Sequence, residues 1–415
     1  MNAPLLVRAE LAPRKGPRIR IFNVKYSPNL GDGLLSECLE QALIDCGADR
    51  DTWSIDLAAR TSYGAGSPAR ALQMRLLEQL PSPVRSLAVR APLAVQSRRR
   101  WAPHYDQSLD GAECVVIGGG NLLADLDLNF PTKISLALEA ASRRQLPVFI
   151  YGCGVSAGWS RQGREMLRTA VRGGAVRKVW VRDERSRRVW NELIGREAGL
   201  EAAVTRDPGL LAAVRYKAGK ARPPSATPLI GLNITSPVAV RYHSRNAPQP
   251  GELDRWYVEF ARVLLGGGCR LAVFSNGSPE DREYIRKLRP RFEALNRDQR
   301  IAFPEPGSPS ALTALIGGCE AVAAFRMHAI IAAYSCGVPF LALAWDPKVE
   351  AFVRSVNLPR WLCVPRETSA PEALRKLSRA MEEGIHSGQR ATFVDEARRG
   401  VEDLYDEMIS ALARA

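Results

Sequence analysis

The sequence predicts an α/β protein built from two Rossmann-like, doubly wound domains that face each other across a cleft. Short apolar segments with strand character alternate with helical segments along most of the 415 residues, as in parallel sheets that carry helices on both faces. A chain of this length is too long for one ordinary hydrophobic core. A basic segment rich in proline, glycine, serine and alanine, residues 216–228, separates two runs of this pattern and is expected to be a linker.

The first run is expected to form an N-terminal domain, residues 18–215, after an extension at residues 1–17. Its first predicted strand, Arg18–Val24, leads through a glycine-containing loop into a helix, Leu34–Cys46, with apolar residues at helical spacing. Further strands are expected at Cys114–Ile117, Pro147–Tyr151 and Val179–Val181. A helix, Arg185–Leu193, is expected to follow the last of them.

The second run is expected to form a C-terminal domain, residues 229–390. Its predicted strands are Leu229–Ile234, Arg270–Phe274, Ala321–Phe325 and Pro339–Ala344, and its predicted helices are Leu253–Leu265, Ser310–Ile316 and His328–Ser335. Residues 391–415 are expected to form one amphipathic helix, of a kind that often packs back across a domain boundary. Its apolar stripe consists of Phe393, Ala397, Val401, Leu404, Met408 and Leu412.

The composition is that of a globular protein, with 46% hydrophobic and 25% charged residues. The formal charge of +14 and the pI of about 9.7 favour acidic partners such as phosphates or anionic lipid surfaces; an arginine-rich surface without a specific partner gives the same numbers. A nucleic-acid binder ranks last, because the 58 lysines and arginines are spread along the chain and aromatic residues make up only 7%.

The cysteines and the apolar segments indicate a cytoplasmic protein. The eight cysteines form no C-x-x-C pair and mostly lie in apolar runs, as in a reducing compartment. Only four histidines are present and none has ligand spacing to a cysteine pair, so no metal site is expected. Residues 1–17 lack the apolar region of a secretory signal, and Ala329–Trp345 is interpreted as a buried helix followed by a strand. Peripheral contact with the anionic inner face of the cell membrane is compatible with the charge.

Ligands of such folds bind at the carboxyl ends of the strands, so the loops that follow strands are the candidate sites. The first of these loops holds Asn29 and Asp32 within the segment NLGDG. Its glycines permit a sharp turn with free amides, and the helix expected near Leu34 would present its N-terminus to an anion. Asp32 fits ligand contact and a simple N-cap about equally.

A second candidate loop contains Gly119, Gly120 and Asn121 after a buried strand. Consecutive glycines let a ligand approach the backbone closely, although a tight turn needs them too. The glycines near Gly154 lack the spacing of a dinucleotide-binding fingerprint, and no P-loop motif is present, which excludes a nicotinamide cofactor and a P-loop site.

A third candidate is Arg182, which ends a predicted strand. Its guanidinium suits a phosphate or carboxylate, and an ion pair with Asp183 or Glu184 is the structural alternative. Asp207 precedes a proline and is interpreted as a turn residue rather than a catalyst.

The strongest candidates are Arg326 and His328, two residues apart, directly after a predicted strand and at the start of an apolar helix. Polar groups in such a setting need partners. An arginine cannot neutralise itself and requires an anion, whereas a histidine titrates near neutral pH and can move a proton. A core histidine beside a structural arginine is the alternative, but the pair at a strand end favours function.

Two further residues follow strands of the second domain. Lys348 is expected to add a positive charge to the same anion site, unless it is a plain surface lysine. His243 is placed at the cleft by the topology and is a candidate for substrate contact, with a solvated loop histidine as the alternative.

Taken together, these motifs resemble the polysaccharide pyruvyl transferase family from about Asn23 to Leu358. The most specific part is an R-x-H-A helix followed by G-V-P-x-L-A-L and a lysine. The four matching segments, in order, are NLGDGLL, IGGGNLL, VRDERS with DPG, and FRMHAIIAAYSCGVPFLALAWDPKVEAF.

The resemblance implies a GT-B-like fold and a transferase that uses phosphoenolpyruvate as donor substrate, with no separate cofactor. Members form pyruvate ketals on sugars of exopolysaccharides and cell-wall polymers, and the acceptor is expected to be a sugar, with a lipid-linked oligosaccharide as one form. Arg326 and His328 match the functional arginine and histidine of the family. Asp32, Gly119, Asn121 and Arg182 match recurring motif positions.

The expected mechanism binds phosphoenolpyruvate to Arg326, Arg182 and helix N-terminal amides, while His328 or a neighbouring group supplies a proton to its methylene carbon. Two alternatives remain open. A GT-B-like glycosyltransferase would hold a nucleotide-sugar diphosphate in the same cleft, and a non-catalytic polysaccharide-assembly protein would bind no small anion.

Overall fold

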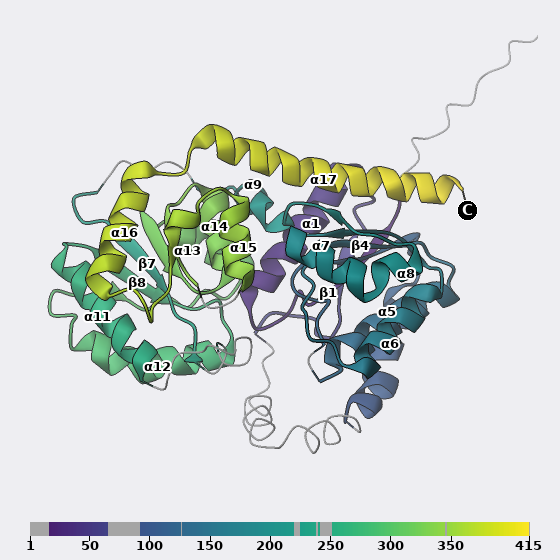
Figure 1. The fold of residues 1–415 in the computed structure, drawn as a ribbon, viewed down its shortest axis with the longest axis horizontal. Helices are drawn as coiled ribbons and strands as arrows, with labels where there is room; N and C mark the ends of the chain where they lie inside the picture. The colour runs from purple at the N-terminus through teal and green to yellow at the C-terminus, as the bar shows by residue number, and fades with distance from the viewer. Residues whose placement is uncertain are drawn as a thin grey trace, which may run out of the picture.

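The structure is a computed structural model, and it describes residues 16–64, 92–125, 127–219, 225–237, 240, 251–344 and 347–414. Two six-stranded sheets form the centre of the molecule, each in one half of the chain (Figure 1). All strand pairs in these sheets are parallel. The prediction of two Rossmann-like domains is therefore confirmed.

The first sheet has the strand order β2-β1-β3-β4-β5-β6. Its fully buried strands alternate between two apolar clusters, as expected for a sheet that is covered on both faces. Cys114 and Val116 of β3, for example, face one cluster, whereas Val115 and Ile117 face the other. The strands are β1 Ile19–Asn23, β2 Trp53–Asp56, β3 Cys114–Gly118, β4 Val148–Cys153, β5 Val176–Val181 and β6 Ala203–Val204.

The second sheet has the order β12-β11-β10-β7-β8-β9. Val322 and Ala324 of β10 face the cluster shared with the first sheet, and Ala321 and Ala323 face a separate one. The strands are β7 Leu229–Asn233, β8 Arg270–Phe274, β9 Ile301–Ala302, β10 Ala321–Ala324, β11 Phe340–Leu343 and β12 Leu362–Cys363.

Helices cover both faces of each sheet. The first half contains α1 Leu30–Asp45, α4 Ala102–Ser108, α5 Asn129–Arg143, α6 Arg161–Arg172, α7 Glu184–Trp190, α8 Arg196–Ala198 and α9 Ala212–Tyr216, with a 3₁₀ helix at Pro208–Leu211 and π-helical turns at Ser97–Trp101 and Asn191–Gly195. The second half contains α11 Glu252–Gly266, α12 Pro279–Glu293, α13 Pro309–Gly317, α14 Met327–Cys336, α15 Pro347–Ser355, α16 Ala370–Glu383 and α17 Ser387–Ala413, with a 3₁₀ helix at Pro359–Trp361.

One apolar cluster joins the two halves. It contains Leu34 of α1, Leu210 of the 3₁₀ helix, Ile330 of α14 and Val401 of α17, all almost fully buried. Because helices of both halves share this core, it fixes where the carboxyl ends of the two sheets meet.

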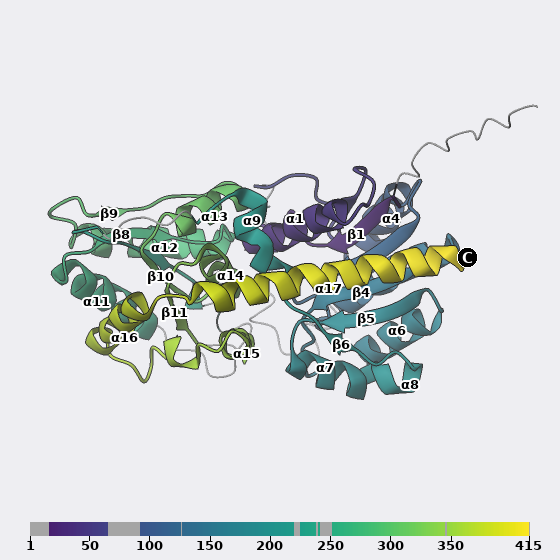
Figure 2. The same cartoon turned by 90° about the horizontal axis from the view of Figure 1, so that it is seen from above.

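Helix α17 lies along both halves of the molecule (Figure 2). The stripe predicted from the sequence is buried from Phe393 to Met408. Polar contacts add to it on the first half, where Arg206 pairs with Glu396 at 2.7 Å and Lys178 with Glu407 at 2.6 Å.

All eight cysteines are free, and seven of them are buried. Among the described residues, no helix is both long and apolar enough to cross a membrane.

Candidate functional site

The two sheets present their carboxyl-end loops to each other, and α1 connects them directly. The backbone N–H of Leu30, at the start of α1, donates to the carbonyl oxygen of Asn276 in the loop after β8, at 2.7 Å. Gly277 in that loop has a φ of +101°, and a Cβ there would lie 2.7 Å from the carbonyl oxygen of Pro28. This close approach requires glycine.

Helix α1 begins at Leu30, four residues earlier than predicted, and this changes the role of Asp32. The side chain of Asn29 accepts a hydrogen bond from the Gly31 N–H at 3.3 Å and is the N-cap. Asp32 therefore lies in the first turn, and the interpretation of Asp32 as N-cap is wrong. A glycine-rich start made the segment look like a loop, but packing against the second half keeps it helical.

Asp32 and His328 form a pair across the junction. The Oδ1 atom of Asp32 lies 3.7 Å from the Nδ1 atom of His328, and the side chains are 19% and 10% exposed. Burial raises the pKa of Asp32 to about 6, against the opposing effects of a hydrogen bond with Ser27 and the charges of Arg60 and Arg326. This carboxyl group thus gains and loses its proton near neutral pH.

The sequence suggested that His328 titrates near neutral pH. In the structure its pKa lies well below that range. Burial, and then the positive charges of Arg182, Arg326 and Lys348, lower its pKa to about 3. Its Nε2 atom is buried and has no hydrogen-bond partner among the residues that the structure describes. The imidazole is therefore neutral, with one polar atom that a ligand can satisfy.

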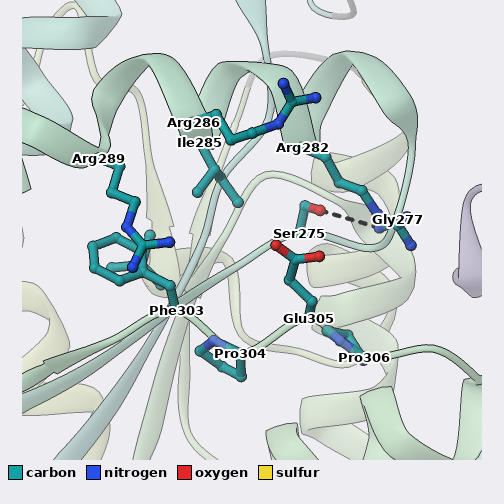
Figure 3. A pocket seen from close by; sticks show the side chains of 11 residues that line it. Ser275, Gly277, Arg282, Ile285, Arg286, Arg289, Phe303, Pro304, Glu305 and Pro306 are labelled. Carbon is teal, nitrogen blue, oxygen red and sulfur yellow. Dashed lines mark hydrogen bonds between the residues drawn. The ribbon is translucent and has the colours of Figure 1, made fainter.

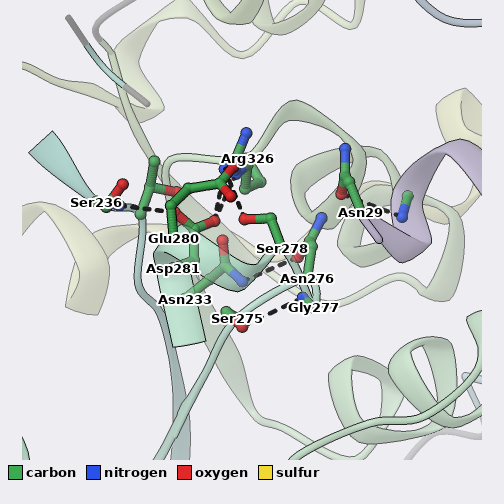
Figure 4. A network of polar contacts seen from close by, with 12 residues as sticks. Asn29, Asn233, Ser236, Ser275, Asn276, Gly277, Ser278, Glu280, Asp281 and Arg326 are labelled. Carbon is green, nitrogen blue, oxygen red and sulfur yellow. Dashed lines mark hydrogen bonds and ion pairs between the residues drawn. The ribbon is translucent and has the colours of Figure 1, made fainter. Parts of the chain in front are cut away.

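Arg326 is the N-cap residue of α14 and finds an internal anion rather than depending on a ligand. Its Nε and Nη2 atoms donate to Oδ2 of Asp281 at 2.9 and 2.6 Å, and Nη2 also donates to Ser278 Oγ at 3.2 Å (Figure 4). Asp281 is fully buried, and its Oδ1 accepts the backbone N–H of Ser236 at 2.8 Å. Among the described residues, Nη1 of Arg326 makes no hydrogen bond, so one edge of the guanidinium is left for a ligand.

Sequence reasoning missed Asp281. It lies in the first turn of α12 within the segment SPEDREYIRK, which looks like a solvated, charged helix. The serine and proline before the two acidic residues mark a helix N-terminus, and this was the one available signal. The partner of Arg326 lies 45 residues away in sequence, which no local pattern reveals.

Arg182 lies in a second part of the site. Its contacts fit both of its proposed roles, the ion pair with Asp183 and the binding of an anionic ligand. Its Nε atom donates to Asp183 at 3.4 Å, as the structural alternative predicted. Its Nη1 atom, however, is buried without a hydrogen-bond partner in the described part of the chain. The guanidinium rests on Gly154, where a Cβ would lie 2.5 Å from Nη2.

A pocket between the two halves brings Arg182 and Lys348 together. Met327, the residue before His328, also lines it, so the pocket adjoins the Asp32–His328 pair. The full lining consists of Arg182, Asp183, Arg206, Asp207, Leu210, Met327, Lys348, Phe352 and Ser355. Two basic residues that the sequence pointed to, Arg182 and Lys348, thus share one cavity. A further arginine, Arg206, lines the same cavity.

Asp207 behaves as the predicted turn residue. Its Oδ1 atom accepts the Gly209 N–H at 2.9 Å and caps the 3₁₀ helix. Its Oδ2 atom is buried without a partner among the described residues, and burial raises its pKa. The positive charge of Arg182 opposes this effect of burial on the Asp207 pKa, so the two side chains interact in this pocket.

The glycine loop after β3 lies at the same edge, and its hydrogen bonds hold it to neighbouring segments of the first half. Gly119 and Gly120 have φ values of +83° and +68°, the Gly119 N–H donates to Tyr151, and Gly120 accepts the Gly154 N–H at 2.7 Å. Asn121 donates to Ser156 Oγ at 2.9 Å. These contacts support the loop under Arg182 and involve neither Asp32 nor His328.

His243 lies outside the residues that the structure describes. Within those residues, no group of three or more histidine, cysteine, aspartate or glutamate side chains is arranged to hold a metal ion.

Gly31→Ala is expected to disturb the site directly. A Cβ at Gly31 would lie 2.5 Å from Cβ and Nδ1 of His328, so the ring must move or α1 must shift, at a cost of about 1–3 kcal/mol. Chemical denaturation would show the loss of stability. The control is Gly266→Ala at the end of α11, where no atom lies within 4 Å; a helical glycine with free space should gain about 0.5–1 kcal/mol on this change. Equal effects of the two substitutions would contradict the packing argument.

A comparison with protein families decides what the chain is. Residues 29–347 match the model of the polysaccharide pyruvyl transferase family. The chain belongs to this family. The match includes Asp32, Arg182, Arg326 and His328, the residues that carry the geometry described above. No curated protein matches the chain.

Solved structures of the GT-B type share the fold of this polysaccharide pyruvyl transferase family member. S. aureus MnaA in complex with UDP has a TM-score of 0.51 at 12% identity, over 96% of this chain and 97% of its own. UDP-GlcNAc 2-epimerase from Neisseria meningitidis, bound to UDP-GlcNAc, has 0.50 at 13%, over 96% and 99%. Anabaena Alr3699/HepE with UDP-glucose has 0.50 at 12%, over 96% and 100%. At these identities the likeness establishes the fold.

Proposed function

We propose that this protein transfers the pyruvyl group of phosphoenolpyruvate to a sugar of a cell-surface or extracellular polysaccharide and forms a pyruvate ketal. The observation that carries the proposal is the pairing of a neutral, buried His328 with Asp32, whose pKa is about 6. Basic residues of both halves surround this pair. Such a site combines a proton donor with binding groups for a small polyanion.

The anion site is supported by buried donors that lack partners. Nη1 of Arg182 is buried without a hydrogen bond in the described part of the chain, and the phosphate or carboxylate of phosphoenolpyruvate would satisfy it. Lys348 lines the same pocket, and the charge of Arg326 acts on His328 as well. Donors held in place by the fold stabilise charge without reorganisation, which is usually the larger catalytic contribution.

The proton for the methylene carbon comes from the Asp32–His328 pair. Near neutral pH the carboxyl group of Asp32 holds a proton in part of the molecules, because its pKa is about 6. His328, with a pKa of about 3, relays or orients this proton as a neutral imidazole. This assignment replaces the expectation that His328 is itself the titrating acid.

The reaction balances with two sugar hydroxyls and no oxidant. Protonation of the methylene carbon turns it into a methyl group and makes the neighbouring carbon electrophilic. The first hydroxyl adds to that carbon, and its proton returns to the Asp32–His328 pair. The carbon–oxygen bond to phosphate then breaks while the second hydroxyl adds, and the second proton leaves with inorganic phosphate. The products are the ketal and phosphate.

Phosphoenolpyruvate is expected to raise the melting temperature of the protein by binding at Arg182. A ligand that binds the native state at a hundred times its Kd adds about 2.7 kcal/mol of stability. The shift should disappear in Arg182→Ala and persist in Arg188→Ala, an exposed arginine of the neighbouring helix. Phosphate release and a new methyl signal in the NMR spectrum of the sugar would then report ketal formation.

A glycosyltransferase with a nucleotide-sugar donor is the second candidate, because three structures of the same fold hold UDP or a UDP-sugar. It predicts a thermal shift with a nucleotide sugar alone, followed by release of the free nucleotide. No shift with either donor would favour a non-catalytic role in polysaccharide assembly.

The charge of +14 is compatible with an acceptor that is carried on a lipid at the anionic face of the membrane. Binding to vesicles with and without anionic lipid tests this part of the proposal independently of the chemistry.

A further inference from the structure

A second pocket lies at the carboxyl ends of β8 and β9, beside the site described above (Figure 3). Helix α12 forms one wall, and the segment after β9 forms the other. The lining residues are Val273, Ser275, Gly277, Arg282, Ile285, Arg286, Arg289, Phe303, Pro304, Glu305 and Pro306. This is the edge of a parallel sheet at which ligands bind, and neither the Asp32–His328 pair nor Arg182 belongs to this pocket.

Three arginines of α12 line one wall. Arg282, Arg286 and Arg289 are spaced four and three residues apart, so they share one face of the helix and span roughly 10 Å. Arg286 and Arg289 pair with Glu283 and Glu293, but these pairs are half or more exposed and are easily exchanged for another anion. The backbone N–H of Arg282 donates to the Ser278 carbonyl oxygen at 3.0 Å, but its side chain makes no hydrogen bond or ion pair with any described residue. The length of this wall suits several anionic oxygens rather than one carboxylate.

The opposite wall has a different chemistry. Phe303 lies beneath the guanidinium of Arg289, with its ring centre 4.8 Å from the guanidinium carbon, and Pro304 and Pro306 continue the apolar surface. Val273 of β8 and Ile285 of α12 add apolar side chains to the pocket. The exposed carboxylate of Glu305 has no ion-pair partner among the described residues and lies at the pocket (Figure 3). Such a wall accepts an apolar or flat group and can accept hydrogen bonds from hydroxyls.

One loop connects this pocket to the candidate active site. Gly277 lines the pocket, while the next residue, Ser278, accepts a hydrogen bond from Arg326. Likewise, Asp281 faces Arg326, and the adjacent residue Arg282 faces the pocket. The loop and helix that would hold a ligand through the arginines are therefore the same ones that hold Arg326.

We propose that this arginine pocket binds the diphosphate through which the acceptor sugar is attached to its carrier, and that it thereby presents the sugar to the Asp32–His328 pair. The assignment of the sugar as acceptor rests on the proposed function above. A nucleoside and a polyprenyl chain are the two sources of such a diphosphate. Both share the anionic group that the arginines recognise, and each fits the apolar wall in its own way.

The test measures binding to the full-length protein by calorimetry with three probes: inorganic pyrophosphate, uridine diphosphate and farnesyl diphosphate. Arg282→Ala should weaken binding by about ten-fold or more, because a charge-assisted hydrogen bond is lost. The control is Arg291→Ala, an exposed arginine of the same helix that does not line the pocket. Its affinity should match that of the unsubstituted protein.

The probes also separate the two sources. Tighter binding of uridine diphosphate than of pyrophosphate, lost in Glu305→Gln, identifies a nucleoside carrier. Tighter binding of farnesyl diphosphate, retained in Glu305→Gln, identifies a polyprenyl carrier. The inference is overturned if none of the three probes binds or if Arg282→Ala leaves their affinity unchanged. Because Arg282→Ala should keep the thermal shift with phosphoenolpyruvate, its result is independent of whether the proposed donor is right.

Discussion

Asp281→Ala is expected to destabilise the folded protein by about 3–5 kcal/mol at neutral pH, because it leaves a buried guanidinium without its counter-charge. Asp281 is fully buried and accepts two hydrogen bonds from Arg326, whose side chain is only 14% exposed. The substitution also removes the acceptor of the Ser236 backbone N–H, which adds to the loss. Chemical denaturation of the two proteins measures the difference directly.

Glu283→Ala provides the matched control on the same helix. Glu283 pairs with Arg286 at the surface, where both side chains are more than half exposed, so its loss should change stability by less than about 1 kcal/mol. The double variant Asp281→Leu/Arg326→Met should recover much of the loss, since it removes both charges together. If Asp281→Ala costs no more than Glu283→Ala, the buried ion pair does not hold the loop after β8 against α14.

The strands were largely predictable because fully buried parallel strands are short apolar runs between helices. β8 was predicted at its observed bounds, Arg270–Phe274, and most other predicted strands differ by a residue or two. The start of α1 was not predictable in this way. Gly31 and Gly33 disfavour a helix locally, and their reason is tertiary: His328 and Tyr63 occupy the space that side chains there would need.

Site residues could be predicted from the sequence where their position in the fold determines their role. They could not be predicted where the role depends on which side chains are buried together. Arg326 and His328 could be found because polar residues that follow a buried strand and begin an apolar helix are unusual. The partner of Arg326 lies on a helix that looks solvated. The exchange of roles between Asp32 and His328 depends on burial and on cations brought from Arg182 and Lys348, which are distant in sequence.

Asp32→Asn is expected to lower kcat for ketal formation by about 10²–10⁴-fold, the usual contribution of a general acid. In the unsubstituted protein, the pKa of Asp32 is raised to about 6, so its acid form is present below pH 6 and is lost as the pH rises. The rate should therefore fall about ten-fold per pH unit above pH 6. Steady-state phosphate release between pH 5 and 8, at saturating phosphoenolpyruvate, measures this profile.

The variant's own pH profile separates Asp32 from other causes of pH dependence. Phosphoenolpyruvate titrates in the same range, but it does so equally with both proteins, so only the difference between the two profiles reports on Asp32. If His328 were the titrating acid, its pKa of about 3 would leave almost no protonated imidazole at neutral pH, and Asp32→Asn would remove no dependence near pH 6.

His328→Gln should also lose activity, because Gln cannot relay a proton, yet it should retain the thermal shift with phosphoenolpyruvate. An Asp32→Asn enzyme with unchanged kcat and profile would transfer the acid role to another group and leave the anion site standing, since Arg182 binds the donor without help from Asp32.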